Sequence, residues 1–219
     1  MLMAIGFPAA SQLPPSAGEL AHYTGLHAAA ARGDVATIER VSASSHDALE
    51  ARDDHGRTPL HVATFVRQRD AVSALIRAGA NTAALENDRY DAVTIASVAD
   101  DEETLRVLLS LGASAKLITS RYDGTALIAA AHLGHDGVVR QLIEAGAPLD
   151  HVNNLHWTAL IEAIVLGDGG TRHQATVVAL VSAGANTQLA DRSGQTPLQL
   201  ARSRGYDAMV HALLAAGAR

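Results

Sequence analysis

Apolar residues recur along this chain in pairs of short amphipathic stretches. In each pair, the first stretch has an aliphatic residue followed three positions later by Ala, which places both on one face of a helix. The second stretch has two aliphatic residues with the same spacing. The first stretches contain Leu26, Leu60, Val93, Leu127, Leu160 and Leu198, followed by Ala29, Ala63, Ala96, Ala130, Ala163 and Ala201. The pattern predicts six helix–turn–helix units that bury their apolar faces against one another.

Signals for the start and the end of these helices recur with the same period. A residue that can cap a helix precedes each unit, and successive caps are 33 or 34 residues apart, except for 38 residues after the fifth. A Gly-Ala pair ends the second helix of most units, where glycine suits the left-handed conformation. The capping residues are Thr24, Thr58, Asp91, Thr125, Thr158 and Thr196. The repeats are therefore expected near residues 20–52, 53–85, 86–118, 119–152, 153–190 and 191–219.

The TPLHVA sequence at residues 58–63, the Gly-Ala stop and the period together resemble the ankyrin repeat family. The resemblance covers about residues 20–219. It implies an all-α solenoid of about six units, each with two antiparallel helices and a short hairpin turn. It also implies that His27 and His61 form hydrogen bonds between repeats instead of binding a ligand.

The first residues differ from the repeats. Residues 1–15 contain three prolines, which disfavour helix, so we expect a flexible tail before a repeat domain of residues 16–219. Ser16 and Glu19 have capping-box spacing, which predicts a short helix at the start of that domain. Arg89 replaces the turn glycine of the third unit, and we expect this turn to be the least regular one.

Composition narrows the classes of function. The net charge is −6 and the Lys and Arg residues are scattered, which argues against nucleic acid binding. The chain has no cysteine and no common catalytic or nucleotide-binding motif, so we expect no enzyme activity, no cofactor and no metal. No apolar run is long enough for a membrane span, and the first residues lack the cations of a signal peptide. These features favour the cytoplasm and leave the periplasm and secretion open.

The family resemblance implies a concave groove, lined by the residue before each cap and by the end of each first helix. Five of the seven aromatic residues fall at these positions, although the predicted core uses almost none. Because Tyr and Trp often anchor protein interfaces, we predict that the concave face and turn tips of repeats 2 to 5 bind another protein or a peptide. Alternatively, the rings pack against one another and stiffen the turns. The predicted partner-binding residues are Arg57, Phe65, Tyr90, Tyr122, His132, Leu133, Trp157, Val165 and Leu166.

The fifth unit carries unusual polar residues. Glu162 lies in its first helix where the other units are apolar, and a buried carboxylate requires a partner. Five extra residues lie between the two helices, around residues 167–173. We therefore predict a polar cluster of Glu162, Asp168, Arg172 and His173, with Glu162 accepting hydrogen bonds from the inserted loop. The cluster either organises this loop or forms a polar site.

Two other functions remain open at this point. The chain could be a small-molecule or metal-binding protein, including a weak hydrolase, that uses the inserted loop of the fifth unit. It could also be a homo-oligomeric scaffold whose groove or end repeats join copies of the chain. The sequence itself identifies no partner.

Overall fold

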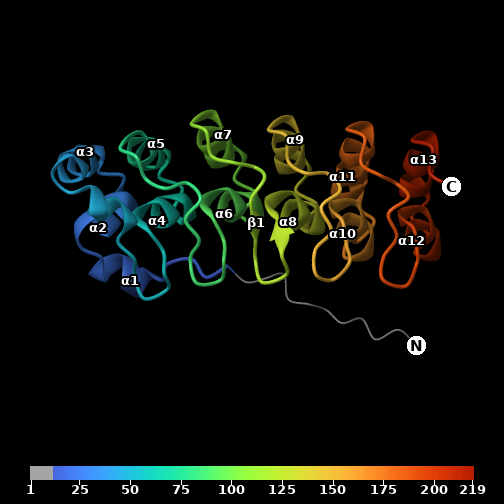
Figure 1. The fold of residues 1–219 in the computed structure, drawn as a ribbon, viewed down its shortest axis with the longest axis horizontal. Helices are drawn as coiled ribbons and strands as arrows, with labels where there is room; N and C mark the ends of the chain where they lie inside the picture. Colours follow the sequence, from blue (N-terminus) through green and yellow to red (C-terminus); the bar gives the residue numbers. More distant parts are fainter. Residues whose placement is uncertain (1–11) are drawn as a thin grey trace.

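The helices stack as pairs in one row that follows the order of the sequence (Figure 1). The computed structural model describes residues 12–219. Within this range the predicted all-α solenoid of six helix pairs is confirmed. The first helices are α2 (Gly25–Arg32), α4 (Pro59–Phe65), α6 (Ala92–Val98), α8 (Ala126–Leu133), α10 (Ala159–Val165) and α12 (Pro197–Ser203). The second helices are α3 (Val35–Ser44), α5 (Arg69–Arg77), α7 (Glu102–Ser110), α9 (Asp136–Glu144), α11 (Thr171–Ser182) and α13 (Asp207–Ala215).

Side-chain caps determine where several helices begin. The carboxylate of Asp91 and the hydroxyls of Thr125, Thr158 and Thr196 each accept a hydrogen bond from a backbone N–H three residues later. These bonds satisfy N–H groups that have no partner within the helix. The predicted capping box at Ser16 forms as well and starts the short helix α1 (Ala17–His22). A 3-10 helix, η1 (His46–Glu50), follows α3.

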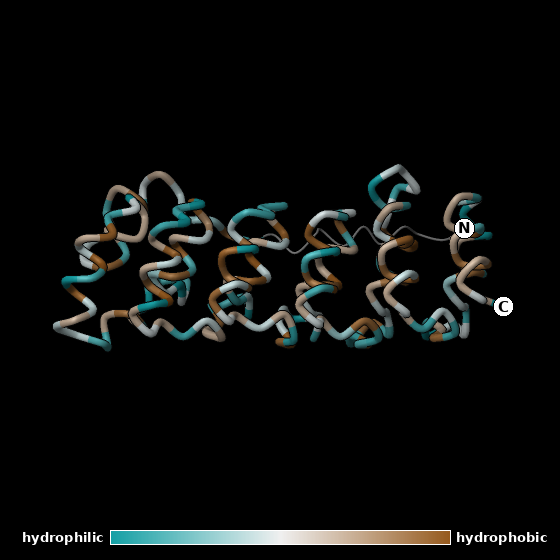
Figure 2. The backbone as a smooth tube through the Cα atoms, turned by 90° about the horizontal axis from the view of Figure 1, so that it is seen from above, coloured by the Kyte–Doolittle hydropathy of each residue, from teal (hydrophilic) through white to brown (hydrophobic). Residues whose placement is uncertain are grey.

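The core lies between neighbouring helix pairs. The repeated alanine of the first helices is at most 1% exposed in every unit, so adjacent first helices approach closely. Apolar stretches recur in each pair along the row (Figure 2). The Nε2 atom of His27 lies 2.8 Å from the carbonyl oxygen of Arg57, which confirms the predicted bond between repeats. The corresponding atom of His61 lies 3.0 Å from the carbonyl oxygen of Ala84, at the end of its own repeat.

One position in the turns has the same left-handed backbone conformation in several repeats. Arg89 has a φ of 68°, close to the 72° of Gly56 at the equivalent position. The expectation that the third turn is the least regular one is therefore wrong at this position. Asp123 and His156 are also left-handed at this place. The fourth turn forms the antiparallel strands β1 (Ile118–Thr119) and β2 (Gly124–Thr125), in the register Ile118 with Thr125.

Part of the expected tail contacts the repeats. Pro15 is buried, and the carbonyl oxygen of Leu13 accepts a hydrogen bond from Arg57 at 3.0 Å. The Nε2 atom of Gln12 donates to the carbonyl oxygen of Thr94 at 3.2 Å. Residues 12–15 therefore pack on repeats 2 and 3, whereas residues 1–11 lie outside the described part of the chain.

The insertion of the fifth unit lengthens a helix. Helix α11 has 12 residues, whereas α5, α7, α9 and α13 have nine each. Arg172 and His173 lie in the first turn of α11 and only residues 166–170 form a loop. No helix within residues 12–219 has the length and apolar character needed to cross a membrane.

Candidate binding groove

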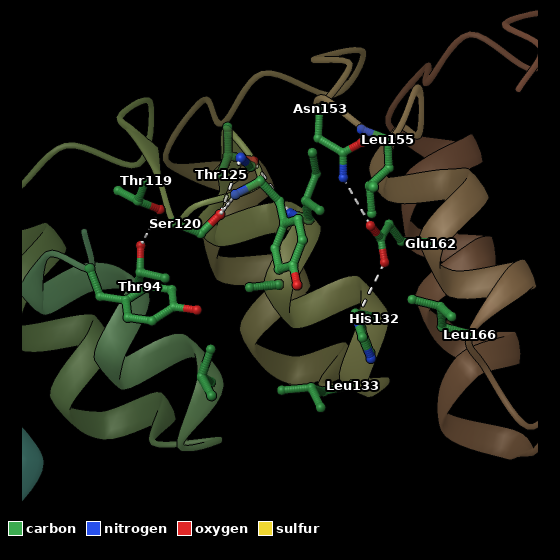
Figure 3. A pocket seen from close by; sticks show the side chains of 16 residues that line it. Thr94, Thr119, Ser120, Thr125, His132, Leu133, Asn153, Leu155, Glu162 and Leu166 are labelled. Atoms are coloured by element: carbon green, nitrogen blue, oxygen red, sulfur yellow. Dashed lines mark hydrogen bonds and ion pairs between the residues drawn. The ribbon is translucent and has the colours of Figure 1, made fainter. Parts of the chain in front are cut away.

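A hollow opens between the first helices of repeats 3 to 5 and the turns that precede them (Figure 3). Helices α6, α8 and α10 supply one side, and the turns, including the β1–β2 hairpin, supply the other. We call this feature the central hollow. Its lining residues are Tyr90, Thr94, Val98, Thr119, Ser120, Tyr122, Gly124, Thr125, Ile128, Ala129, His132, Leu133, Asn153, Leu155, Glu162 and Leu166.

The central hollow contains five of the nine predicted partner-binding residues. They are Tyr90, Tyr122, His132, Leu133 and Leu166. Two come from the turns and three from the ends of first helices, which are the two kinds of position that the family resemblance implied. The structure therefore brings these side chains together on one face.

Phe65, Trp157, Val165 and Arg57 do not line the central hollow. Phe65 is half-buried at the end of α4, one repeat nearer the N-terminus. Trp157 and Val165 are half-buried and pack against the hydrophobic core. The packing of Trp157 was not predicted, because the core was assigned to aliphatic residues alone.

Arg57 is only 1% exposed and forms an ionic network, so the prediction that its side chain lines an open groove is wrong. Its Nε atom donates to Asp53 Oδ2 at 2.7 Å, and its Nη2 atom pairs with Glu19. The hydroxyl of Tyr23 donates to the same Asp53 oxygen at 2.6 Å. Helix α1 and the carbonyl of Leu13 cover the guanidinium, which leaves it inaccessible to a partner.

The aromatic rings differ in their roles. Tyr90 is 4% exposed and lines the hollow, and its burial raises the pKa of the phenol to about 12. Tyr122 is half-buried in the hollow. The ring of Tyr23 lies against His27, with 5.3 Å between ring centroids. Tyr23 therefore packs against a histidine instead of another of the predicted rings, and Tyr122 has the more accessible ring of the two in the hollow.

Glu162 lies in the wall of the central hollow and is 4% exposed. Its Oε1 atom accepts a hydrogen bond from Asn153 Nδ2 at 2.9 Å (Figure 3). Its Oε2 atom lies 3.3 Å from His132 Nδ1, but it has no hydrogen-bond partner among the described residues. The prediction that the inserted loop hydrogen-bonds Glu162 is therefore wrong, because the partner comes from the preceding turn.

The other members of the predicted polar cluster lie in two separate groups. His173 Nδ1 is 2.8 Å from Asp168 Oδ1, and the pKa of this carboxyl is lowered by hydrogen bonds from the Gly170 N–H and from His173. Arg172 instead pairs with Asp100 at 2.9 Å, in another repeat. These contacts support a structural role for the insertion.

The four residues of the predicted polar cluster do not come together in the fifth unit. Glu162 faces the central hollow, while Asp168 and Arg172 belong to the loop and to the start of α11. Within residues 12–219, no three His, Asp or Glu side chains converge as metal ligands would.

Asn153 is a member of the site that the sequence analysis missed. It lies five residues before the cap of its repeat and is 4% exposed. At the equivalent places Asp53 and Asp191 accept hydrogen bonds from N–H groups of their own turns. One signal in the sequence could have revealed the pair of Asn153 and Glu162. Asn153 stands where Asp53 and Asp191 have a carboxylate, and it does so in the repeat that contains Glu162.

Comparisons with known proteins point to one family. A model of three ankyrin repeats matches residues 93–188, and a model of a single ankyrin repeat matches residues 55–87 and 193–219. The ankyrin repeat protein YahD of Escherichia coli K12 is 35% identical over 191 residues, which cover 87% of this chain and 94% of that protein.

Solved structures show the same likeness. The crystal structure of an ankyrin repeat domain from Acinetobacter baumannii AYE has 46% identity and a TM-score of 0.81, and covers 89% of this chain and 98% of that one. The ankyrin repeat domain of Bcl-3, of the IκB protein family, has 28% identity and a TM-score of 0.79, and covers 90% and 88%.

Proposed function

This chain belongs to the ankyrin repeat family, and from that premise we propose that it is a non-enzymatic interaction module whose central hollow binds a segment of a partner protein. Ankyrin repeat domains are in general protein–protein interaction modules. The stacked repeats produce an extended concave surface, and binding usually takes place on it.

The observation that carries this proposal is the composition of the hollow. Apolar side chains such as Val98, Leu133 and Leu166 surround a few polar groups, among them Glu162. Binding sites commonly combine an apolar wall with a small number of oriented polar groups. The hollow extends over three repeats, which suits an extended peptide segment better than a compact solute.

Selection from a displayed library of random dodecapeptides on the immobilised chain tests the proposal. We expect enrichment of related peptides with apolar residues. Ala129→Trp places a large ring in the hollow from helix α8, and it should weaken binding of the selected peptides by about tenfold or more. Val178→Trp is the matched control, because Val178 is 48% exposed on α11, outside the hollow.

Two results would contradict the proposal. One is that no related peptides are enriched on the wild-type chain. The other is that peptides bind the Ala129→Trp variant as tightly as the wild type, because they would then occupy another surface. Thermal unfolding of both variants checks that a loss of binding is not a loss of the fold.

A further inference from the structure

A buried carboxylate oxygen in the central hollow has no hydrogen-bond partner. We propose that the hollow recognises a lysine side chain of the bound peptide, whose ammonium group donates to Oε2 of Glu162. This inference rests on the proposed function and adds the chemical class of the side chain that is recognised.

The burial of Glu162 creates the need for such a ligand. The residue is 4% exposed, and only its Oε1 atom accepts a hydrogen bond, from Asn153. A carboxylate removed from water without full hydrogen bonding is unfavourable, so a donor that reaches Oε2 gains a strong charge-assisted bond. Oε2 of Glu162 is thus an unsatisfied acceptor within the wall of the central hollow.

Within residues 12–219, no lysine or arginine forms an ion pair with this carboxylate. Arg172 pairs with Asp100 and Asp136, and Arg204 donates to the carbonyl oxygen of Val165 at 3.2 Å. His132 is the nearest basic side chain, and its Nδ1 atom lies 3.3 Å from Oε2 without forming a hydrogen bond. A permanently charged group that hydrogen-bonds Oε2 of Glu162 would therefore come from the partner.

The geometry favours lysine over arginine. A guanidinium binds best when both carboxylate oxygens accept in parallel, and Asn153 already donates to Oε1 of Glu162, so Oε2 is the oxygen without a hydrogen bond. An ammonium group is a compact charge that needs only one oxygen. The methylene stem of a lysine can pack against Leu133 and Leu166 while its charged end reaches the carboxylate.

Parallel library selections on three chains test this inference. The chains are the wild type, Glu162→Gln, and Glu144→Gln as the control, because Glu144 is an exposed glutamate at the end of α9. We expect lysine at a fixed position in the peptides selected by the wild type and by the control. The Glu162→Gln chain should still select apolar peptides, without the lysine.

Calorimetric titration with one selected peptide then measures the contact. Replacing its lysine by norleucine, which keeps the stem and removes the charge, should weaken binding to the wild type by about tenfold or more. The same replacement should change binding to the Glu162→Gln chain by less than about threefold. The comparison of the lysine and norleucine peptides on the wild type needs no substituted chain. It therefore remains a valid test even if the Glu162→Gln chain folds poorly.

The outcomes separate this inference from the proposed function. Enriched apolar peptides without a fixed lysine would overturn the inference and leave the proposed function standing. A fixed arginine that binds more tightly than lysine would overturn the argument from the single free oxygen. An equal loss with norleucine on the wild type and on Glu162→Gln would place the lysine elsewhere. No enrichment at all would remove both proposals.

Discussion

The side-chain amide of Asn153 joins the fifth turn to the helix that follows it, because Asn153 Nδ2 donates to Glu162 Oε1 at 2.9 Å. The other end of the amide supports the turn, since Oδ1 accepts from the N–H groups of Leu155 and Trp157 at 3.0 Å each. Aspartate performs only the second task at the equivalent position of the second repeat, Asp53. Asparagine is required here because only an amide both accepts from the turn and donates to the carboxylate.

Asn153→Asp should therefore destabilise the chain by about 2–3 kcal/mol, although it keeps the turn acceptor. The substitution removes the donor and places a second carboxylate against Glu162 in a buried setting. Urea unfolding measures the change. Adding Glu162→Gln should recover most of the loss, since the new amide can donate to the aspartate. A double variant no more stable than Asn153→Asp alone would contradict this pairing.

The sequence predicted the fold well because each repeat carries the same local signals. The caps at Thr158 and Thr196 and the buried alanines fix the helix starts and the packing face, and both are visible in a single repeat. The face that carries the hollow was also predictable, since Tyr122 and Leu133 lie near the turn and first-helix positions that the family resemblance implied.

The partners of the polar side chains were less predictable. The position of Arg57 in the turn predicted an exposed side chain, but helix α1 and the backbone of Leu13 cover it. Neither of these segments follows the repeat period. Glu162 was predicted to accept hydrogen bonds from the inserted loop that follows it. Its hydrogen-bond donor is instead Asn153, nine residues before it. Such contacts depend on side-chain directions in three dimensions, which the spacing of residues does not give.

Substitution of Arg57 should have a large effect on stability. We expect Arg57→Met to cost about 3–5 kcal/mol, because it leaves the carboxylates of Asp53 and Glu19 without their cation in a covered site. Arg121→Met is the control, since Arg121 also pairs with a carboxylate, that of Asp88, but is 72% exposed. It should cost less than about 1 kcal/mol. Equal losses in urea unfolding would show that burial does not set the difference.

The pH dependence of stability should reveal the carboxyl of Glu19. Hydrogen bonds from the side chain and backbone of Ser16, helped by Arg57, lower its pKa from 4.5 to about 2. A carboxyl with a lowered pKa in the folded chain stabilises it fully above the unfolded value, and this contribution is lost as the pH falls toward the folded value. The contribution should therefore decrease between about pH 4.5 and pH 2.

Unfolding midpoints of the wild type and of Glu19→Gln between pH 6 and pH 2 measure this contribution. The wild type should be the more stable chain at pH 6, and the two should converge as the pH approaches 2. A stability difference that stays constant over this range would mean that Glu19 acts through packing alone and that its pKa is not lowered by folding.

His156 and Gly194 test the backbone of the turns, because both occupy the same left-handed place in their repeats, with φ values of 69° and 76°. A side chain with a Cβ atom is strained in this conformation by about 1–2 kcal/mol. His156→Gly should relieve that strain and raise stability by about 0.5 kcal/mol, since the greater freedom of glycine in the unfolded chain offsets part of the gain. The bond from its N–H to the carbonyl oxygen of Asn153 is kept.

The reciprocal change, Gly194→Ala, should lower stability by a similar amount. An added Cβ at Gly194 meets no atom within 4 Å, so the cost comes from the backbone alone and not from a clash. His211→Gly is the control for glycine itself, because His211 is exposed in helix α13 and glycine should destabilise there by about 1 kcal/mol. If His156→Gly lowered the unfolding midpoint as His211→Gly does, the left-handed turn would carry no strain, and the repeated conformation would reflect the hydrogen bonds of the turn instead.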